Sequence, residues 1–182
     1  MTKMKISYFG NPVLGRVAKN LTTADITSHK YKVLIKNILE LINTKDLGIG
    51  LAAPQIGESV KIAVISIKPT KVRPNVDKVQ MVIINPEYEG VGRRASMWEG
   101  CLSSGTKRNV LFAKAMRYKT IQASWLDEAG KIHNRKLEGL VAQVFQHETD
   151  HLDGILFVDR VRDSKTYMHA SEYKKRILKT KA

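Results

Sequence analysis

The chain has 182 residues, of which 43% are apolar and 26% are charged. This length and composition favour a single globular domain over residues 1–182 and exclude a disordered chain. No apolar run reaches the roughly 18 residues that a membrane-spanning helix needs, and the first residues lack the apolar stretch of a signal peptide. Because Cys101 is the only cysteine, no intrachain disulfide can form. We therefore expect a monomeric cytoplasmic protein with no membrane attachment.

The net charge of +14 comes from 31 Lys and Arg against 17 Asp and Glu. A field of this sign attracts polyanions such as RNA, ribosomes and anionic lipid. The charges are scattered, apart from Lys174-Lys175-Arg176 and the pair Lys179 and Lys181, and no nucleic-acid-binding motif accompanies them. Two interpretations stay open: a solvated basic surface, or a basic C-terminal helix that contacts ribosomal RNA.

Residues 1–24 are expected to form an N-terminal arm, in which Asn11-Pro12 starts a short helical turn. A helix is predicted over residues 27–46, capped by Asp25 or Thr27. Lysines fill one side of this helix, and its other side is apolar. The apolar positions are Tyr31, Leu34, Ile35, Ile38, Leu41 and Ile42.

The stretch from Gly48 to Gly57 reads as a loop of small residues that lets backbone approach a ligand closely. It is not a phosphate-binding loop, because no Gly-Lys-Ser/Thr follows, and it lacks the spacing of a dinucleotide fingerprint. Taken alone, the stretch is better explained as a tight structural turn.

Strands are expected where apolar and β-branched residues cluster between turn signals. Residues 68–78 should be an exposed basic loop, Pro86 should end the strand before it, and residues 90–98 fit either strand or loop. The element order predicts an α+β domain in which antiparallel strands wrap around a central helix close to the C-terminus. The predicted strands are residues 60–67, 81–85, 119–126 and 131–137.

That central helix carries the pattern His147-Glu148-x-x-His151. Two histidines four residues apart project from one face of a helix, so both imidazoles can bind one ion with Glu148 beside them. Apolar residues recur at spacings of three and four, and Gly154 is the usual residue after a helix end. The alternative is a pair of unconnected histidines on a partly buried helix.

A hydrolytic site of this type needs a third protein ligand and one open position. The extended pattern with a third histidine is excluded, because Phe157 stands at that position. Glu172, which lies 21 residues after His151, matches the spacing of thermolysin-type proteases. Cys101 is the other candidate, although a lone cysteine is more often an inert core residue.

Three separated segments resemble, in order and spacing, the three motifs of the peptide deformylase family. With the arm Asn11–Arg16 the resemblance covers nearly the whole chain. It implies that one divalent metal ion is bound, typically Fe(II) in vivo and replaceable by Zn, Ni or Co. It also implies removal of the formyl group from N-formylmethionine on newly synthesised polypeptides. The segments are Gly48–Gln55, Glu99–Ser103 and Gln146–His151, and the implied metal ligands are Cys101, His147 and His151.

The resemblance implies that hydroxide on the ion attacks the formyl carbon while Glu148 acts as general acid and base. It also implies that the Gln55 amide and the Leu102 backbone N–H stabilise the oxyanion, and that Gly50 leaves room for the substrate. Leu140 and Val144 precede His147 on the same helix face, so we expect them, with Ile49, to bind the methionine side chain. Plain core packing is the alternative for both.

Where the family usually has an apolar residue and proline, this chain has Ser104-Gly105. The lost proline predicts a more mobile loop beside the substrate cleft and a possible change in efficiency or side-chain preference. Two other functions are alternatives: a metalloprotease that uses Glu172, and a basic ribosome- or RNA-binding module with a structural metal. Glu148 and Gln55 argue against the second, because a structural site fills its fourth position with protein.

Overall fold

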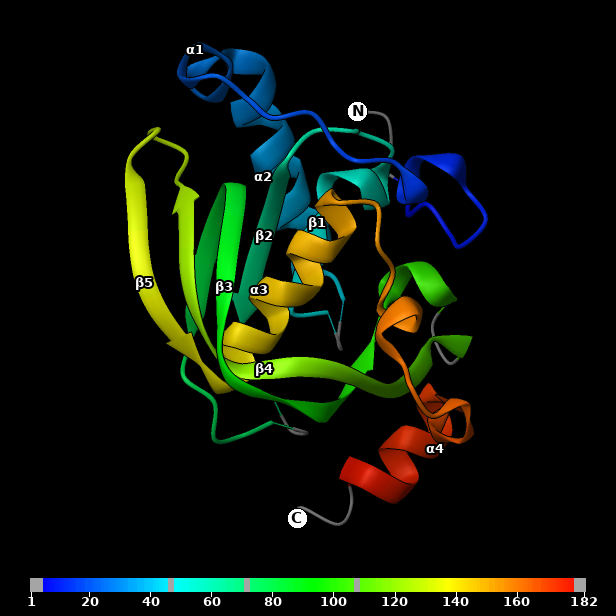
Figure 1. Cartoon of the computed structure of the whole chain (residues 1–182). Coiled ribbons are helices and arrows are strands. Elements are labelled where there is room, and N and C mark those ends of the chain that lie inside the picture. The colour runs from blue at the N-terminus through cyan, green and yellow to red at the C-terminus, as the bar shows by residue number, and fades with distance from the viewer. Residues whose placement is uncertain (1–4, 46–47, 71–72, 107–108, 179–182) are drawn as a thin grey trace.

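A curved antiparallel sheet organises the chain (Figure 1). The computed structural model describes residues 5–45, 48–70, 73–106 and 109–178. Neighbouring strands follow the order β1-β2-β3-β4-β5, and β6 pairs with β4. The strands are β1 Gly50–Ala52, β2 Ile62–Ile67, β3 Val79–Gly100, β4 Leu111–Leu126, β5 Ile132–Glu138 and β6 Met168–His169.

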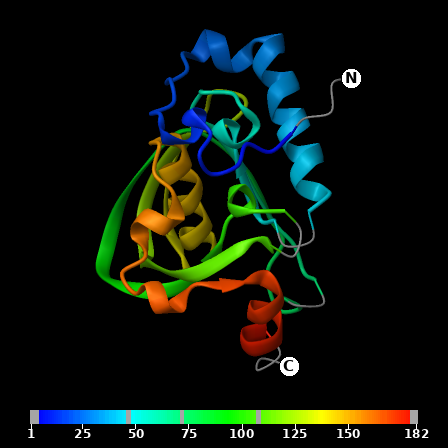
Figure 2. The same cartoon turned by 90° about the vertical axis from the view of Figure 1, so that its right-hand side faces the viewer.

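Strand β2 is buried on both faces, as its unbroken apolar run predicts. Ile62 and Val64 pack in the cluster that contains α2, whereas Ala63 and Ile65 pack in the cluster that contains α3. Figures 1 and 2 show α3 inside the curve of β3 and β4, with α2 on the opposite face of β2. The helix that carries the two histidines is therefore enclosed by core.

Strand β3 is far longer than expected, and the prediction that Pro86 ends a strand is wrong. The pairing with β4 shifts between Ile84 and Glu87, and again between Val91 and Arg94. A bulge interrupts the regular ladder of hydrogen bonds, so a proline, which has no backbone N–H, can be accommodated there. A bulge also bends the strand. Residues 90–98 are strand, and β4 starts at Leu111 rather than Lys119.

The helix predicted over residues 27–46 is two helices, α1 Thr23–Thr27 and α2 His29–Asn43. Ser28 is extended (φ −66°, ψ 152°) and breaks the run. Thr22, rather than Asp25 or Thr27, caps the first helix, and Asp25 completes the capping box. The predicted apolar face is buried at Tyr31, Leu34, Ile35, Ile38 and Ile42, while Leu41 packs partly buried against it.

Helix α3 spans Gly139–Leu152, as predicted. It ends in the expected left-handed turn, with Gly154 at φ 72° and the Ile155 N–H donating to the Asp150 carbonyl over 2.8 Å. The predicted turn at Asn11-Pro12 is also present, as a 3-10 helix over Pro12–Gly15.

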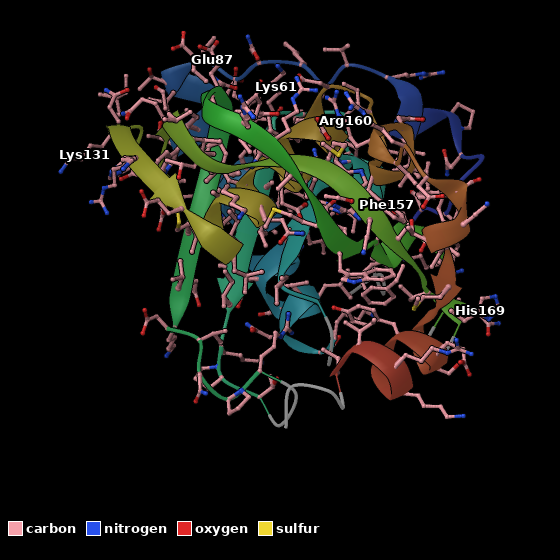
Figure 3. All side chains as sticks on the ribbon, turned by 60° about the horizontal axis from the view of Figure 1, so that its bottom comes forward. Lys61, Glu87, Lys131, Phe157, Arg160 and His169 are labelled. Atoms are coloured by element: carbon pink, nitrogen blue, oxygen red, sulfur yellow. The ribbon has the colours of Figure 1, made fainter. Side chains whose placement is uncertain are left out.

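The C-terminal basic helix begins as α4 Ala170–Tyr173 and continues in a π-helical turn over Lys174–Leu178. The predicted Lys179 and Lys181 lie outside the described residues. Figure 3 shows His169 at the end of the molecule near this helix and Lys131 at the turn of the β4–β5 hairpin, far from it. Among the described residues, no helix is long and apolar enough to cross a membrane.

Candidate metal centre and active site

Cys101, His147 and His151 come together although 46 residues or more separate the cysteine from the histidines. Cys101 directly follows β3, and both histidines lie on α3. The ligand atoms of the three residues lie within 4.8 Å of one another, with Cys101 Sγ 3.2 Å from His151 Nε2. Within the described part of the chain, no other group of three such side chains converges in this way.

The three side chains fit a divalent metal ion. A thiolate and two imidazoles are a common donor set for zinc or iron, and three ligands leave a position open for water. Burial lowers the pKa of His151 well below its usual value, which favours the neutral imidazole that binds metal. The buried Nδ1 of His151 has no hydrogen-bond partner among the described residues.

His147 is oriented by a carboxylate behind it. Its Nδ1 lies 3.0 Å from Glu99 Oε2, so its Nε2 is left to face Cys101 and His151. Burial raises the pKa of Glu99, but the hydrogen bond from His147 and the charge of Arg117 outweigh it and bring that pKa down to about 2. Glu99 therefore stays a carboxylate.

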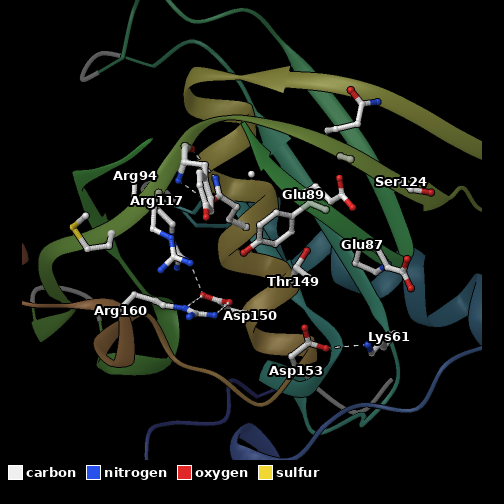
Figure 4. A pocket seen from close by; sticks show the side chains of 18 of the residues that line it. Lys61, Glu87, Glu89, Arg94, Arg117, Ser124, Thr149, Asp150, Asp153 and Arg160 are labelled. Carbon is white, nitrogen blue, oxygen red and sulfur yellow. Dashed lines mark hydrogen bonds and ion pairs between the residues drawn. The ribbon is translucent and has the colours of Figure 1, made fainter. Parts of the chain in front are cut away.

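Arg117 joins this carboxylate to the far side of α3. It is 1% exposed, binds Glu99 over 2.8 and 3.0 Å, and donates to Asp150 as well. Arg160 approaches Asp150 from outside at 2.7 Å, as Figure 4 shows. No role in the site was predicted from the sequence for Glu99, Arg117, Asp150 or Arg160. The signal was present in β4, where Arg117 stands in line with the buried Ala113 and Ala115.

Glu148 is the buried acid beside the ligands. It is 2% exposed, and its Oε2 has no hydrogen-bond partner in the described structure. Burial raises its pKa to about 7. A Cβ at Gly50 would collide with this carboxylate, so the small-residue stretch after α2 allows β1 to press against α3. That stretch is β1 and a 3-10 helix over Ala53–Ile56.

Gln55 points its amide group toward the ligand cluster. Its Oε1 accepts from the Ala52 N–H at 2.8 Å, and its Nε2 lies 3.1 Å from Ser103 Oγ and 3.6 Å from Cys101 Sγ. Leu102 begins the next 3-10 turn, Leu102–Ser104, and the first N–H of such a turn has no partner within it.

A cleft of about 920 Å³ opens beside these groups. It brings together the residues that were predicted to touch the substrate, and Val144 is nearly covered at 5% exposure. Phe157, at the position that excluded a third histidine, packs its ring 6.2 Å from that of His147. The predicted residues that line the cleft are Ile49, Gly50, Gln55, Leu102, Leu140, Val144, His147 and Glu148.

The loop after Cys101 is tethered in a way that the sequence did not suggest. Ser104 Oγ donates to the Cys101 carbonyl at 2.6 Å and accepts from the Leu111 N–H at 2.9 Å. A side chain at Gly105 would collide with the Asn109 carbonyl. The hydrogen bonds of Ser104 restrain this loop. That the loop is more mobile than one with the family's proline stays a prediction.

Glu172, the alternative ligand, lies on α4 with its side chain 42% exposed and bonded to Arg176 at 2.7 Å. It is not part of the converging group.

Comparison with known proteins bears on the same residues. The sequence model of polypeptide deformylase matches residues 3–167. The chain belongs to the polypeptide deformylase family. A peptide deformylase of Leptospira biflexa is 36% identical over 170 residues, which are 92% of each chain. One of Chlorobaculum tepidum is 38% identical over 161 residues, covering 87% of this chain and 79% of that protein.

Solved structures of the family have the same fold. The crystal structure of peptide deformylase from Thermotoga maritima superposes with a TM-score of 0.74 at 34% identity, covering 90% of this chain and all of that one. The Met-Ala-Ser-bound enzyme of Acinetobacter baumannii gives 0.79 at 26% identity, over 87% and 98% of the two chains. These likenesses confirm the α+β prediction and the assignment to an enzyme family whose members remove N-formyl groups from nascent peptides.

Proposed function

We propose that this enzyme removes the formyl group from the N-formylmethionine of new polypeptides with a divalent ion held by Cys101, His147 and His151. The observation that carries the proposal is the convergence of these three buried donors beside Glu148, a buried carboxylate with an unpartnered oxygen. When bound, the ion would act as a Lewis acid that lowers the pKa of water and polarises the formyl oxygen.

Fe(II) is the ion we infer for the cell. The donor set alone suits zinc and iron equally, so the choice rests on the family resemblance. Fe(II) beside a thiolate is prone to oxidation, and activity should fall in air.

Glu148 supplies the proton transfers. As a carboxylate it takes the proton of the attacking water, and as an acid it delivers that proton to the leaving amine. A pKa near 7 suits both roles at neutral pH. Gly50, by touching the carboxylate, limits how far it can move from the ligands.

The formyl oxygen gains negative charge during the attack, and this chain offers two donors to it. Gln55 Nε2 is held in place because its Oε1 is anchored on the Ala52 N–H. The Leu102 N–H is the second donor. Removing one donor of this kind typically raises the barrier by about 3 kcal/mol.

Leu140, Val144 and Ile49 supply the apolar wall for the methionine side chain. The following peptide would add beside β1, which is an edge strand of the sheet. Main-chain pairing of this type tolerates many sequences, as an enzyme acting on most new polypeptides requires.

The enzyme is further proposed to be a cytoplasmic monomer that contacts ribosomal RNA through its C-terminal helix. The net charge of +14 and the exposed Lys174, Lys175 and Arg176 support this proposal.

The test is an anaerobic assay of formyl-Met-Ala-Ser with metal analysis on the same sample. The wild-type protein should release formate, and Glu148→Gln should lose activity by about a hundredfold to ten-thousandfold while it keeps its metal. Full activity in Glu148→Gln would rule out the acid–base role.

A further inference from the structure

The substrate cleft contains cations that form no ion pair with a carboxylate in the described part of the chain. Lys45, Arg73 and Lys174 line it, and none of them forms an ion pair with a residue that the structure describes. The two carboxylates in the same lining are Glu99 and Glu148. Glu99 is already bound to Arg117, and Glu148 lies beside the metal ligands. The other charged side chains that line the cleft, among the residues described, are therefore positive.

Arg73 is the most constrained of the three cations. Its backbone is held by two hydrogen bonds to Thr70, because the Thr70 N–H donates to the Arg73 carbonyl at 3.1 Å and the Arg73 N–H donates to the Thr70 carbonyl at 3.0 Å. Its Nε is buried, as is Thr70 Oγ1, and both atoms lack a hydrogen-bond partner among the described residues. Burial lowers the pKa of Arg73, as expected where a cation has lost part of its contact with water.

An aromatic group lies next to this cation. The Tyr173 ring stacks on Phe112 with centroids 4.1 Å apart and lies 5.6 Å from Trp98. All three residues line the cleft. Burial raises the pKa of Tyr173, and the positive charge of Arg73 opposes that rise. Arg73 and this aromatic group therefore line the same cleft, and a charge there is screened less by water than a charge at an open surface.

We propose that Arg73 binds a carboxylate of the substrate downstream of its formylmethionine, with Lys45 and Lys174 adding to the attractive field. The enzyme then prefers polypeptides with Asp or Glu among the first few positions after methionine. A guanidinium matches a carboxylate with two parallel hydrogen bonds, and side-chain carboxylates are the common anions of a nascent chain. The proposal rests on the deformylase function and names a preference within it.

The test compares pairs of C-terminally amidated formyl peptides that differ only by Asp against Asn. Three pairs place the variable residue at the second, third or fourth position after formylmethionine. If none of these positions shows an effect, further pairs place it at the first and fifth positions. At low salt, the wild-type kcat/KM for the Asp peptide should exceed that for its Asn partner by roughly five- to twentyfold at one position, mainly through KM. The ratio should shrink in high salt.

Arg73→Gln should bring the ratio close to one, and Arg73→Lys should keep part of it. Arg93→Gln is the matched control, because it removes one positive charge from an exposed position of β3 outside the cleft, and it should keep the wild-type ratio. Affinities of the deformylated products, measured by calorimetry, should show the same discrimination.

A wild-type ratio near one at every position would overturn the proposal, and so would an equal fall in Arg73→Gln and Arg93→Gln, which would indicate a general field. Failure to deformylate the Asn peptides would instead contradict the deformylase function. The calorimetric discrimination then still decides whether Arg73 binds the carboxylate.

Discussion

Gly50 and Glu148 are in contact, and this contact couples the edge strand β1 to α3, which carries the proposed acid–base residue. In Gly50→Ala the new methyl group must displace the carboxylate. We expect kcat/KM for formyl-Met-Ala-Ser to fall at least about tenfold, because small misplacements of a catalytic group are costly, while metal content stays at the wild-type level. Both quantities are measured on one anaerobic preparation.

Gly15→Ala is the control for this substitution. A methyl group there would meet no atom within 4 Å, so activity should be unchanged. If Gly50→Ala were as active as Gly15→Ala, the proposed positioning of Glu148 by this glycine would be wrong.

Single residues were predictable where a motif carries its own geometry. His147 and His151 follow from helical spacing, and the family resemblance placed Cys101, which spacing alone left open beside Glu172. Glu99 and Arg117 were missed as site residues. The alternation along β4 places Arg117 on the buried face, but it does not say that Glu99 of β3 and Asp150 of α3 are its partners.

At the scale of secondary-structure elements, buried ion pairs of Arg117 join β4 to β3 and to α3. Arg117→Met would leave Glu99 and Asp150 with much less compensation for their buried charges. We expect a loss of about 3–5 kcal/mol in the free energy of unfolding, measured by urea denaturation. Lys36→Met removes an exposed pair with Glu40 and should cost less than about 1 kcal/mol.

Arg117→Met should also unfold more readily in acid than the wild-type protein. The pKa of Glu99 is about 2 in the folded protein, below the usual 4.5 of a glutamate. This carboxylate therefore stabilises the fold above pH 4.5 and loses that effect as the pH falls toward 2. Without Arg117 the folded pKa rises, and acid unfolding should begin at higher pH. Equal acid midpoints for Arg117→Met and Lys36→Met would contradict this.

At the level of elements, periodicity predicted α3 and the apolar face of α2 well. It failed at Pro86, where a bulge keeps β3 continuous, and at Ser28, where one extended residue divides a helical pattern. Both failures concern backbone geometry that the neighbouring strand or helix imposes.

The order of the elements predicted the α+β architecture of the whole molecule, but its charge left two interpretations open. If the C-terminal helix contacts ribosomal RNA, Lys175→Glu should weaken co-sedimentation with ribosomes and reduce its dependence on salt. Lys131→Glu makes the same change at the distant hairpin turn (Figure 3) and should have a smaller effect. Equal effects would indicate a diffuse field rather than a contact at this helix.

The central claim is that one sulfur and two imidazoles share an ion, and metal content after anaerobic purification tests it most directly. Wild-type protein and Glu172→Gln should each carry about one ion per chain, and Cys101→Ser should lose most of it. If Cys101→Ser kept its metal while Glu172→Gln lost it, the account of this site would be wrong.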